Sequence, residues 1–254
     1  MAHLRTKAIF AIFAACLGNT AFAVPIYWTD WQGSDLMAGR GFQGQGTLTT
    51  PTSSVTVTYT NLQGIGFYQT NGVTDYWQNG KNGRNDAISP YTSSLVDNSP
   101  TGTDIIALSK MGDQTLLFSQ TIANPVFSFV SLNGNGYAFL NQDFEILSVS
   151  GVDGNACGYW GCGGVTKTIV DLGNGDLQYR LNSTGGEPHG TIRFTGAFDT
   201  VSWRSLTNEY WNGFTVGVQG TAAEVFPAPS PAPLALLCVG FVSLMVTRWR
   251  SQPA

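Results

Sequence analysis

Histidine, cysteine and charge are all scarce in this chain of 254 residues. Only 11% of the residues are charged, and the chain has 2 histidines and 4 cysteines. His189 is the one histidine away from the N-terminus, in a turn-like stretch where we expect it to be exposed. This scarcity disfavours a zinc site, and no Gly-x-Ser-x-Gly stretch accompanies the histidine to indicate a Ser–His–Asp triad.

Helical periodicity is also lacking between the two ends of the chain, whereas Gly, Ser, Thr, Asn and aromatic residues are abundant. Apolar runs predict strands at 54–59, 126–130, 144–149, 191–194, 200–204 and 213–218. Asn-Gly and Asp-Gly pairs between them predict tight turns, Asn174-Gly175 among them. Region 72–103 is polar and predicts long loops over one end of the fold. We therefore predict an all-β fold, a single β-sandwich of jelly-roll type at 24–224.

The first residues have the three parts of a secretory signal peptide. Arg5 and Lys7 form a positive n-region, an apolar stretch follows, and Ala21 and Ala23 are small residues at the positions that signal peptidase reads. We predict a signal peptide at 1–23. The alternative is a retained helix, but the apolar run is too short to cross a bilayer.

The C-terminal segment 225–254 has a proline-rich break, an uncharged apolar stretch and a basic end. Arg248 and Arg250 can reach the membrane surface with their charged ends, and Trp249 suits the interface. This order predicts a transmembrane helix at 232–247 with the body of the protein facing outward. The alternative is a buried strand or helix of the core.

This order of parts resembles the PEP-CTERM sorting signal of exported bacterial proteins, which membrane enzymes called exosortases read. The Pro-Glu-Pro motif that gives the family its name aligns with Pro227, Ala228 and Pro229, so Ala228 stands in place of the Glu. The basic residues that end the sorting signal align with Arg248 and Arg250. The resemblance implies export, anchoring in the inner membrane of a Gram-negative bacterium and processing by an exosortase. It further implies a final place at the cell surface or in the extracellular matrix of a biofilm.

The body between these signals is acidic. It contains all 16 acidic residues but only 8 of the 12 basic ones, because four basic residues belong to the terminal signals, so its formal charge is −8. A surface of this sign argues against nucleic acid and anionic polysaccharide as partners. Neutral exopolysaccharide remains open as a partner.

Cys157 and Cys162 are the only cysteines of the body, since the other two lie in the terminal signals. Export to an oxidising compartment and a spacer with two glycines predict a disulfide between them. The bridge closes a small loop and presents Tyr159 and Trp160 outward. The spacing is not Cys-x-x-Cys, so we interpret the bridge as structural.

Aromatic residues next to polar ones form candidate glycan contacts at Trp77, Tyr159, Trp160 and Trp211. Flat rings stack against sugar faces, while neighbouring amides and carboxylates bond sugar hydroxyls. The alternative is that these rings fill the sandwich core or cover its edge.

Two sets of acidic residues allow other chemistry. Asp143 and Glu145 alternate along a predicted strand and form a candidate carboxylate pair for glycoside hydrolysis, although solvent-facing charges explain them equally well. Asp171, Asn174 and Asp176 surround a glycine turn and form a candidate for structural calcium, although an Asn-Gly turn needs no metal.

The sequence favours a non-enzymatic component of the cell surface or extracellular matrix, without a cofactor apart from the calcium option. A carbohydrate-binding module that recognises exopolysaccharide is the second hypothesis. A glycoside hydrolase or lyase is the third.

Overall fold

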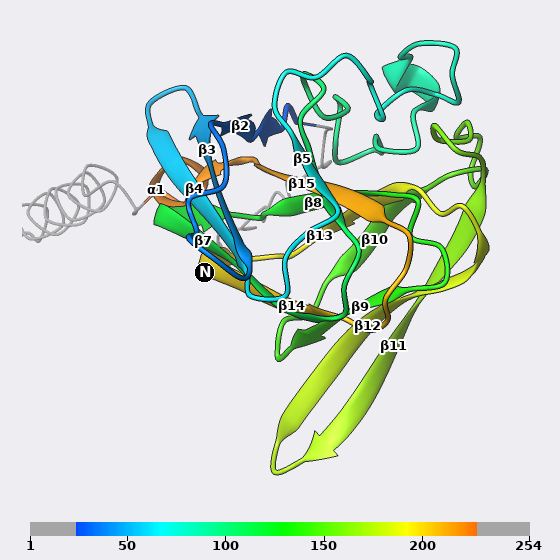
Figure 1. The fold of residues 1–254 in the computed structure, drawn as a ribbon. Helices are drawn as coiled ribbons and strands as arrows, with labels where there is room; N and C mark the ends of the chain where they lie inside the picture. The colour runs from blue at the N-terminus through cyan, green and yellow to red at the C-terminus, as the bar shows by residue number, and fades with distance from the viewer. Residues whose placement is uncertain (1–23, 228–254) are drawn as a thin grey trace, which may run out of the picture.

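Two antiparallel β-sheets pack together in the computed structural model, which describes residues 24–227 (Figure 1). The predicted signal peptide, the predicted transmembrane segment and most of the predicted sorting motif lie outside the described residues. In the part that is described, no helix has the length and apolar character needed to cross a membrane. The coarse prediction of a β-sandwich is confirmed.

The first sheet has the strand order β10-β13-β8-β15-β6-β5, with β1 beside β15. These strands are β1 Tyr27–Trp28, β5 Phe67–Gln69, β6 Ile105–Leu108, β8 Val126–Val130, β10 Glu145–Val149, β13 Gly190–Arg193 and β15 Asn212–Val218.

The second sheet has the order β11-β12-β9-β14-β7-β4-β3-β2, with β16 beside β7. Its strands are β2 Asp30–Gln32, β3 Phe42–Thr49, β4 Ser54–Asn61, β7 Gly112–Ala123, β9 Gly136–Leu140, β11 Gly163–Gly173, β12 Asp176–Gly186, β14 Ala197–Ser205 and β16 Gly220–Thr221. From β6 onward the chain passes from one sheet to the other at nearly every connection. The series β6-β15-β8-β13 therefore lies in one sheet and β7-β14-β9-β12 in the other.

All six predicted strands exist with small shifts of their ends, as β4, β8, β10, β13, β14 and β15. The only helical segments of the described chain are the 3-10 turn η1, Asp86–Ile88, and the short helix α1, Ala222–Val225. The remaining strands were not predicted: β1, β2, β3, β5, β6, β7, β9, β11, β12 and β16.

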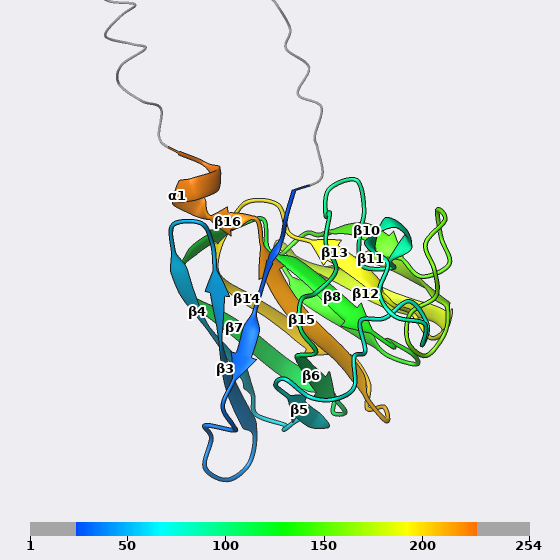
Figure 2. The same cartoon turned by 90° about the horizontal axis from the view of Figure 1, so that it is seen from above.

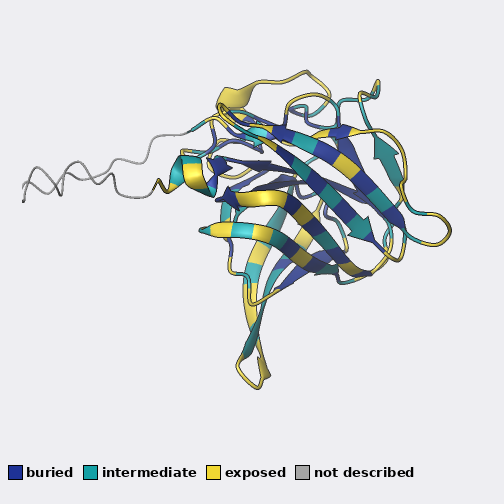
Figure 3. Cartoon of the chain, turned by 90° about the vertical axis from the view of Figure 1, so that its left-hand side faces the viewer, coloured by how far each residue is buried: buried dark blue, intermediate teal, exposed yellow. Residues whose placement is uncertain are grey.

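The core lies between the sheets because alternate residues of each strand point inward. In β4 the inward residues are Val55, Val57 and Tyr59, as their alternation predicts, and each is fully buried. Figure 3 shows this alternation as bands of buried and exposed residues along the strands. Phe127 and Phe214 stack at the centre of the core, with ring centroids 4.8 Å apart.

Strands β11 and β12 form a long hairpin that extends away from the rest of the sandwich (Figure 1). Asn174 and Gly175 form its turn with φ of 51° and 91°. Positive φ at both central residues is the requirement of the two-residue turn that an Asn-Gly pair predicts. This predicted turn is confirmed.

The segment between β5 and β6 contains η1 and otherwise runs as loops over one end of the sandwich (Figure 1), as predicted. It is linked to the loop that carries the two cysteines: the Gly80 N–H donates to Cys157 O at 2.8 Å and the Ala156 N–H donates to Ile88 O at 2.7 Å. Two long connections therefore support each other at this end.

Candidate functional site

An aromatic cluster lies where the β5–β6 loop, the cysteine loop and the segment before β15 meet. Its members are Phe67, Tyr76, Tyr159, Trp160 and Trp211. The ring centroids of Tyr76 lie 5.1 Å from those of both Tyr159 and Trp211, and Tyr159 lies 4.8 Å from Trp160. All three pairs meet edge to face, the arrangement that aromatic quadrupoles favour. The structure thus brings together three of the four aromatic residues predicted as glycan contacts.

Trp77, the fourth of these residues, is fully buried. It packs with Tyr91, Ile105 and Val130 in a small core beneath the aromatic cluster. Its indole Nε1 donates to Asp104 O at 3.1 Å. The prediction that Trp77 contacts a glycan is therefore wrong, because the ring is needed to support the loop from within.

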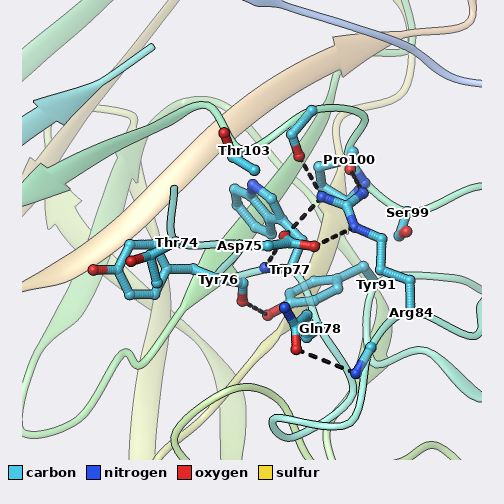
Figure 4. Close-up of polar contacts among 12 residues, drawn as sticks. Thr74, Asp75, Tyr76, Trp77, Gln78, Arg84, Tyr91, Ser99, Pro100 and Thr103 are labelled. Carbon is cyan, nitrogen blue, oxygen red and sulfur yellow. Dashed lines mark hydrogen bonds and ion pairs between the residues drawn. The ribbon is translucent and has the colours of Figure 1, made fainter. Parts of the chain in front are cut away.

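An ion pair between Arg84 and Asp75 closes the loop around this small core (Figure 4). The Arg84 Nε and Nη2 atoms each lie 2.7 Å from a different carboxylate oxygen of Asp75, a bidentate arrangement. The Asp75 carboxylate also accepts from the Trp77 N–H at 3.0 Å, and the Arg84 guanidinium also donates to the carbonyls of Pro100 and Gly102. These contacts hold the segment that carries Tyr76.

Cys157 and Cys162 form a disulfide, as predicted, with their Cα atoms 4.6 Å apart. Gly158 and Gly161 exchange backbone hydrogen bonds of 3.0 and 3.1 Å across the loop. Trp160, at the tip, is 45% exposed. The loop therefore presents this indole outward, as predicted, whereas Tyr159, for which the same was predicted, is half-buried and packs against Tyr76.

His189 is fully buried beneath the disulfide loop, so the prediction of an exposed turn histidine is wrong. Its Nδ1 lies 3.0 Å from the Tyr91 hydroxyl. Gly158 lies against the imidazole, since a Cβ at that position would be 2.2 Å from the ring. Burial lowers the pKa of His189 to about 3, which leaves the imidazole neutral.

Beside the disulfide loop is a hollow of ≈ 250 Å³, which we call the aromatic hollow. Its lining consists of Ser131, Asn133, Trp160, Glu187, Tyr210 and Trp211. The Glu187 carboxylate accepts hydrogen bonds from the Ser131 hydroxyl and from Asn133 Nδ2, the latter at 2.7 Å. The backbone N–H of Glu187 donates to Cys162 O at 2.9 Å, which links Glu187 to the disulfide loop.

Glu187, Ser131 and Asn133 were not predicted as site residues, because Glu187 is 56 positions from Ser131 and 54 from Asn133, and none of them belongs to a motif. The stretch Gly-Gly-Glu-Pro-His-Gly gave the only local signal, and it pointed to His189 instead of Glu187.

Lys81 lies over the outer part of the aromatic cluster. Its Nζ is 5.1 Å from the centroid of the Tyr159 ring and 4.8 Å from that of Trp160. Both distances fall within the range of a cation–π interaction.

The candidate carboxylate pair does not converge on this hollow. Asp143 forms an ion pair with Lys167, and Glu145 forms one with Arg193 at 2.8 Å. Asp143 lies before β10 and not within it, and both carboxylates are exposed. Both carboxylates line a separate hollow of ≈ 140 Å³ with Phe144 and Thr195, but each is paired with its own cation, as in ordinary surface salt bridges.

The candidate calcium residues lie at the turn of the β11–β12 hairpin. The Asp171 carboxylate accepts from the Gly173 N–H at 2.8 Å, and the Asp176 carboxylate accepts from Asn141 Nδ2 at 2.8 Å. Within the described part of the chain, no group of three or more His, Cys, Asp or Glu side chains is placed to hold a metal ion.

Comparisons of the chain with protein-family models, with curated proteins and with solved structures find no match.

Proposed function

We propose that this protein is an exported, non-enzymatic surface or matrix protein that binds polysaccharide through the aromatic hollow. The observation that carries the proposal is the meeting of Trp160 and Trp211 with the polar groups of Ser131, Asn133 and Glu187 in one hollow. Each of these groups comes from a connection between strands, where binding residues concentrate in β-sandwiches.

The chemistry of the lining suits a sugar. Indole and phenol rings pack against the apolar C–H faces of a pyranose, while a carboxylate accepts and an amide both donates and accepts hydrogen bonds with its hydroxyls. A volume of ≈ 250 Å³ is small and suits one unit of a polymer better than a whole drug-sized ligand.

We further propose that the sandwich is a jelly roll, which the strand order supports. In one sheet the order is β6-β15-β8-β13, and in the other it is β7-β14-β9-β12. This is the pairing that two interleaved Greek keys produce, and lectins are among the domains built in this way. The disulfide agrees with export, because such bonds persist in oxidising compartments.

The position of α1 is compatible with an anchor in the C-terminal tail. The aromatic hollow lies at the start of β15, next to Trp211, whereas β16 and α1 follow the end of that strand (Figure 2). A strand of this length separates its two ends by about 20 Å. A tail that follows α1 and is held in the inner membrane until an exosortase cuts it would leave the hollow facing away from the membrane.

Affinity electrophoresis in gels that contain a panel of polysaccharides tests the binding. We expect at least one polymer to retard the protein, and Trp160→Ala to abolish the retardation. Ile169→Ala is the matched control, because Ile169 is also exposed but lies on the β11–β12 hairpin. If no polymer retards the protein, or if both variants behave alike, the binding proposal is wrong.

The mass of the mature protein tests the sorting. In cells with an active exosortase we expect loss of the N-terminal 23 residues and a cut near Pro229, with the product at the surface or in the matrix. In cells without the enzyme we expect the tail to remain and the protein to stay in the inner membrane fraction. Full-length protein in the cytosol would contradict the proposal.

A further inference from the structure

We propose that the sugar unit bound in the aromatic hollow carries a free ammonium group and that Glu187 is its counter-charge. The inference rests on the proposed polysaccharide binding and names the class of polymer: one that contains amino sugars without their acetyl groups. It follows from the charge and the ring arrangement of the hollow, in three steps.

The first step is that Glu187 has no cationic partner among the described residues. The four ion pairs of residues 24–227 engage Asp75, Asp113, Asp143 and Glu145. Glu187 instead receives neutral donors from Ser131 and Asn133. These bonds orient the carboxylate without neutralising it, and two of its roughly four lone-pair sites are left for a further donor.

The second step concerns the rings. Trp160, Tyr210 and Trp211 line the same hollow as Glu187, with Trp160 45% and Tyr210 93% exposed, so a carboxylate and aromatic side chains border one open space. This combination suits an ammonium ligand, because the ring faces are negative and the carboxylate supplies the full counter-charge. The Lys81 ammonium, which lies 4.8 Å from the Trp160 centroid, shows that this indole is placed to receive such a group.

The third step excludes the other sugar classes. A uronic acid or sulfated unit would bring a second negative charge next to Glu187, on a body whose formal charge is already −8. An N-acetylated unit keeps one N–H donor but carries no positive charge to compensate that of the carboxylate. A neutral hexose meets no repulsion, but it leaves the charge of the carboxylate uncompensated. An ammonium satisfies both the carboxylate and the rings.

The test compares three hexasaccharides of the same length: one of glucosamine, one of N-acetylglucosamine and one of glucose. Their affinities for the purified exported domain are measured by calorimetry at a slightly acidic pH, where the amines are protonated. We expect the glucosamine oligomer to bind about tenfold to a hundredfold more tightly than the others, the range typical of a hydrogen bond to a charged group. The preference should shrink as salt is raised.

Glu187→Gln should remove this preference and leave the weaker binding of the neutral oligomers unchanged. Asp171→Asn is the matched control, since it changes the net charge equally but lies at the far end of the β11–β12 hairpin. If Asp171→Asn weakens glucosamine binding as much as Glu187→Gln does, the attraction is to the acidic body in general and the inference is overturned.

The variant Lys81→Met adds a second test, because the inference predicts that it raises the affinity for the glucosamine oligomer. Removing the Lys81 ammonium removes a charge that repels another ammonium, so glucosamine binding should strengthen more than glucose binding does. Weaker glucosamine binding would overturn the inference. Equal binding of all three oligomers by the unmodified protein would overturn the ammonium assignment but leave polysaccharide binding intact. Binding of none of them would also overturn the ammonium assignment, and the gel panel decides separately on polysaccharide binding.

Discussion

Loss of the Cys157–Cys162 disulfide should destabilise the domain by a modest and calculable amount. The two cysteines are separated by 5 positions in the sequence. Closing so short a loop in the unfolded chain corresponds to about 2 kcal/mol at 25 °C in the chain-entropy model. For a domain of this size we expect the melting temperature to fall by about 4 to 8 °C.

Loss of the disulfide should also lower the affinity for polysaccharide. Without the bridge, the Gly80–Cys157 and Glu187–Cys162 backbone hydrogen bonds remain, so the loop stays attached at both ends. The indole of Trp160 between them loses its fixed position. Ordering it again on binding costs free energy, which we expect to appear as a lower affinity.

Thermal unfolding of the Cys157→Ser/Cys162→Ser variant, followed by tryptophan fluorescence, measures the first effect. Reductant provides the control: it should lower the melting temperature of the unmodified domain and leave that of the double variant unchanged, because residues 24–227 contain no other cysteine. A shift below about 1 °C would refute the entropy argument. A full shift with unchanged affinity would refute the idea that the bridge positions Trp160.

Four further predictions concern the core, the glycine beneath the disulfide loop and two buried ionisable groups. Phe127→Ala should cost about 3 to 5 kcal/mol in urea unfolding, whereas Leu117→Ala, at a side chain 53% exposed, should stay within about 0.5 kcal/mol. Gly158→Ala should lower the melting temperature and weaken binding, because its Cβ would meet the His189 ring; an unchanged melting temperature would show that the ring moves freely. Burial lowers the pKa of His189 from 6.5 to about 3, so its contribution to stability is lost as pH falls through that window, and His189→Gln should remove this slope. Burial raises the pKa of Glu209 from 4.5 to about 7, so its contribution to the free energy of unfolding is lost as pH rises over that range. Urea unfolding at several pH values should show this decrease for the unmodified protein and not for Glu209→Gln.

Sharp alternation or burial on both faces made some strands predictable, such as β4 and β8, but β3, which also alternates, and β6, which is fully buried, were missed. In β4, Val55, Val57 and Tyr59 are fully buried and separated by residues that are less buried, so the period of two is visible in the sequence. The β11–β12 hairpin has no such contrast, because nearly all its side chains are partly or fully exposed. In this hairpin only the Asn174-Gly175 pair, which predicts a two-residue turn, could be recognised from the sequence.

The candidate site was less predictable because burial depends on partners far along the chain. Trp77 and Trp160 each follow a tyrosine in polar surroundings, yet one is fully buried and the other is 45% exposed. His189 is buried because Tyr91, 98 positions away, meets its ring. No local pattern contains such contacts, so composition could suggest an aromatic site but could not choose its members.

The hollow is assembled from connections that all emerge at one end of the sandwich. Ser131 and Asn133 lie between β8 and β9, Trp160 between β10 and β11, Glu187 between β12 and β13, and Trp211 between β14 and β15. None of these residues belongs to the main core, although Trp211 packs against the small core beneath the loops. Changes at Glu187 or Trp160 should therefore alter ligand preference at little cost to the fold, as loops on a rigid scaffold allow. Finding both positions intolerant to substitution in an unfolding assay without ligand would contradict this separation of binding from stability.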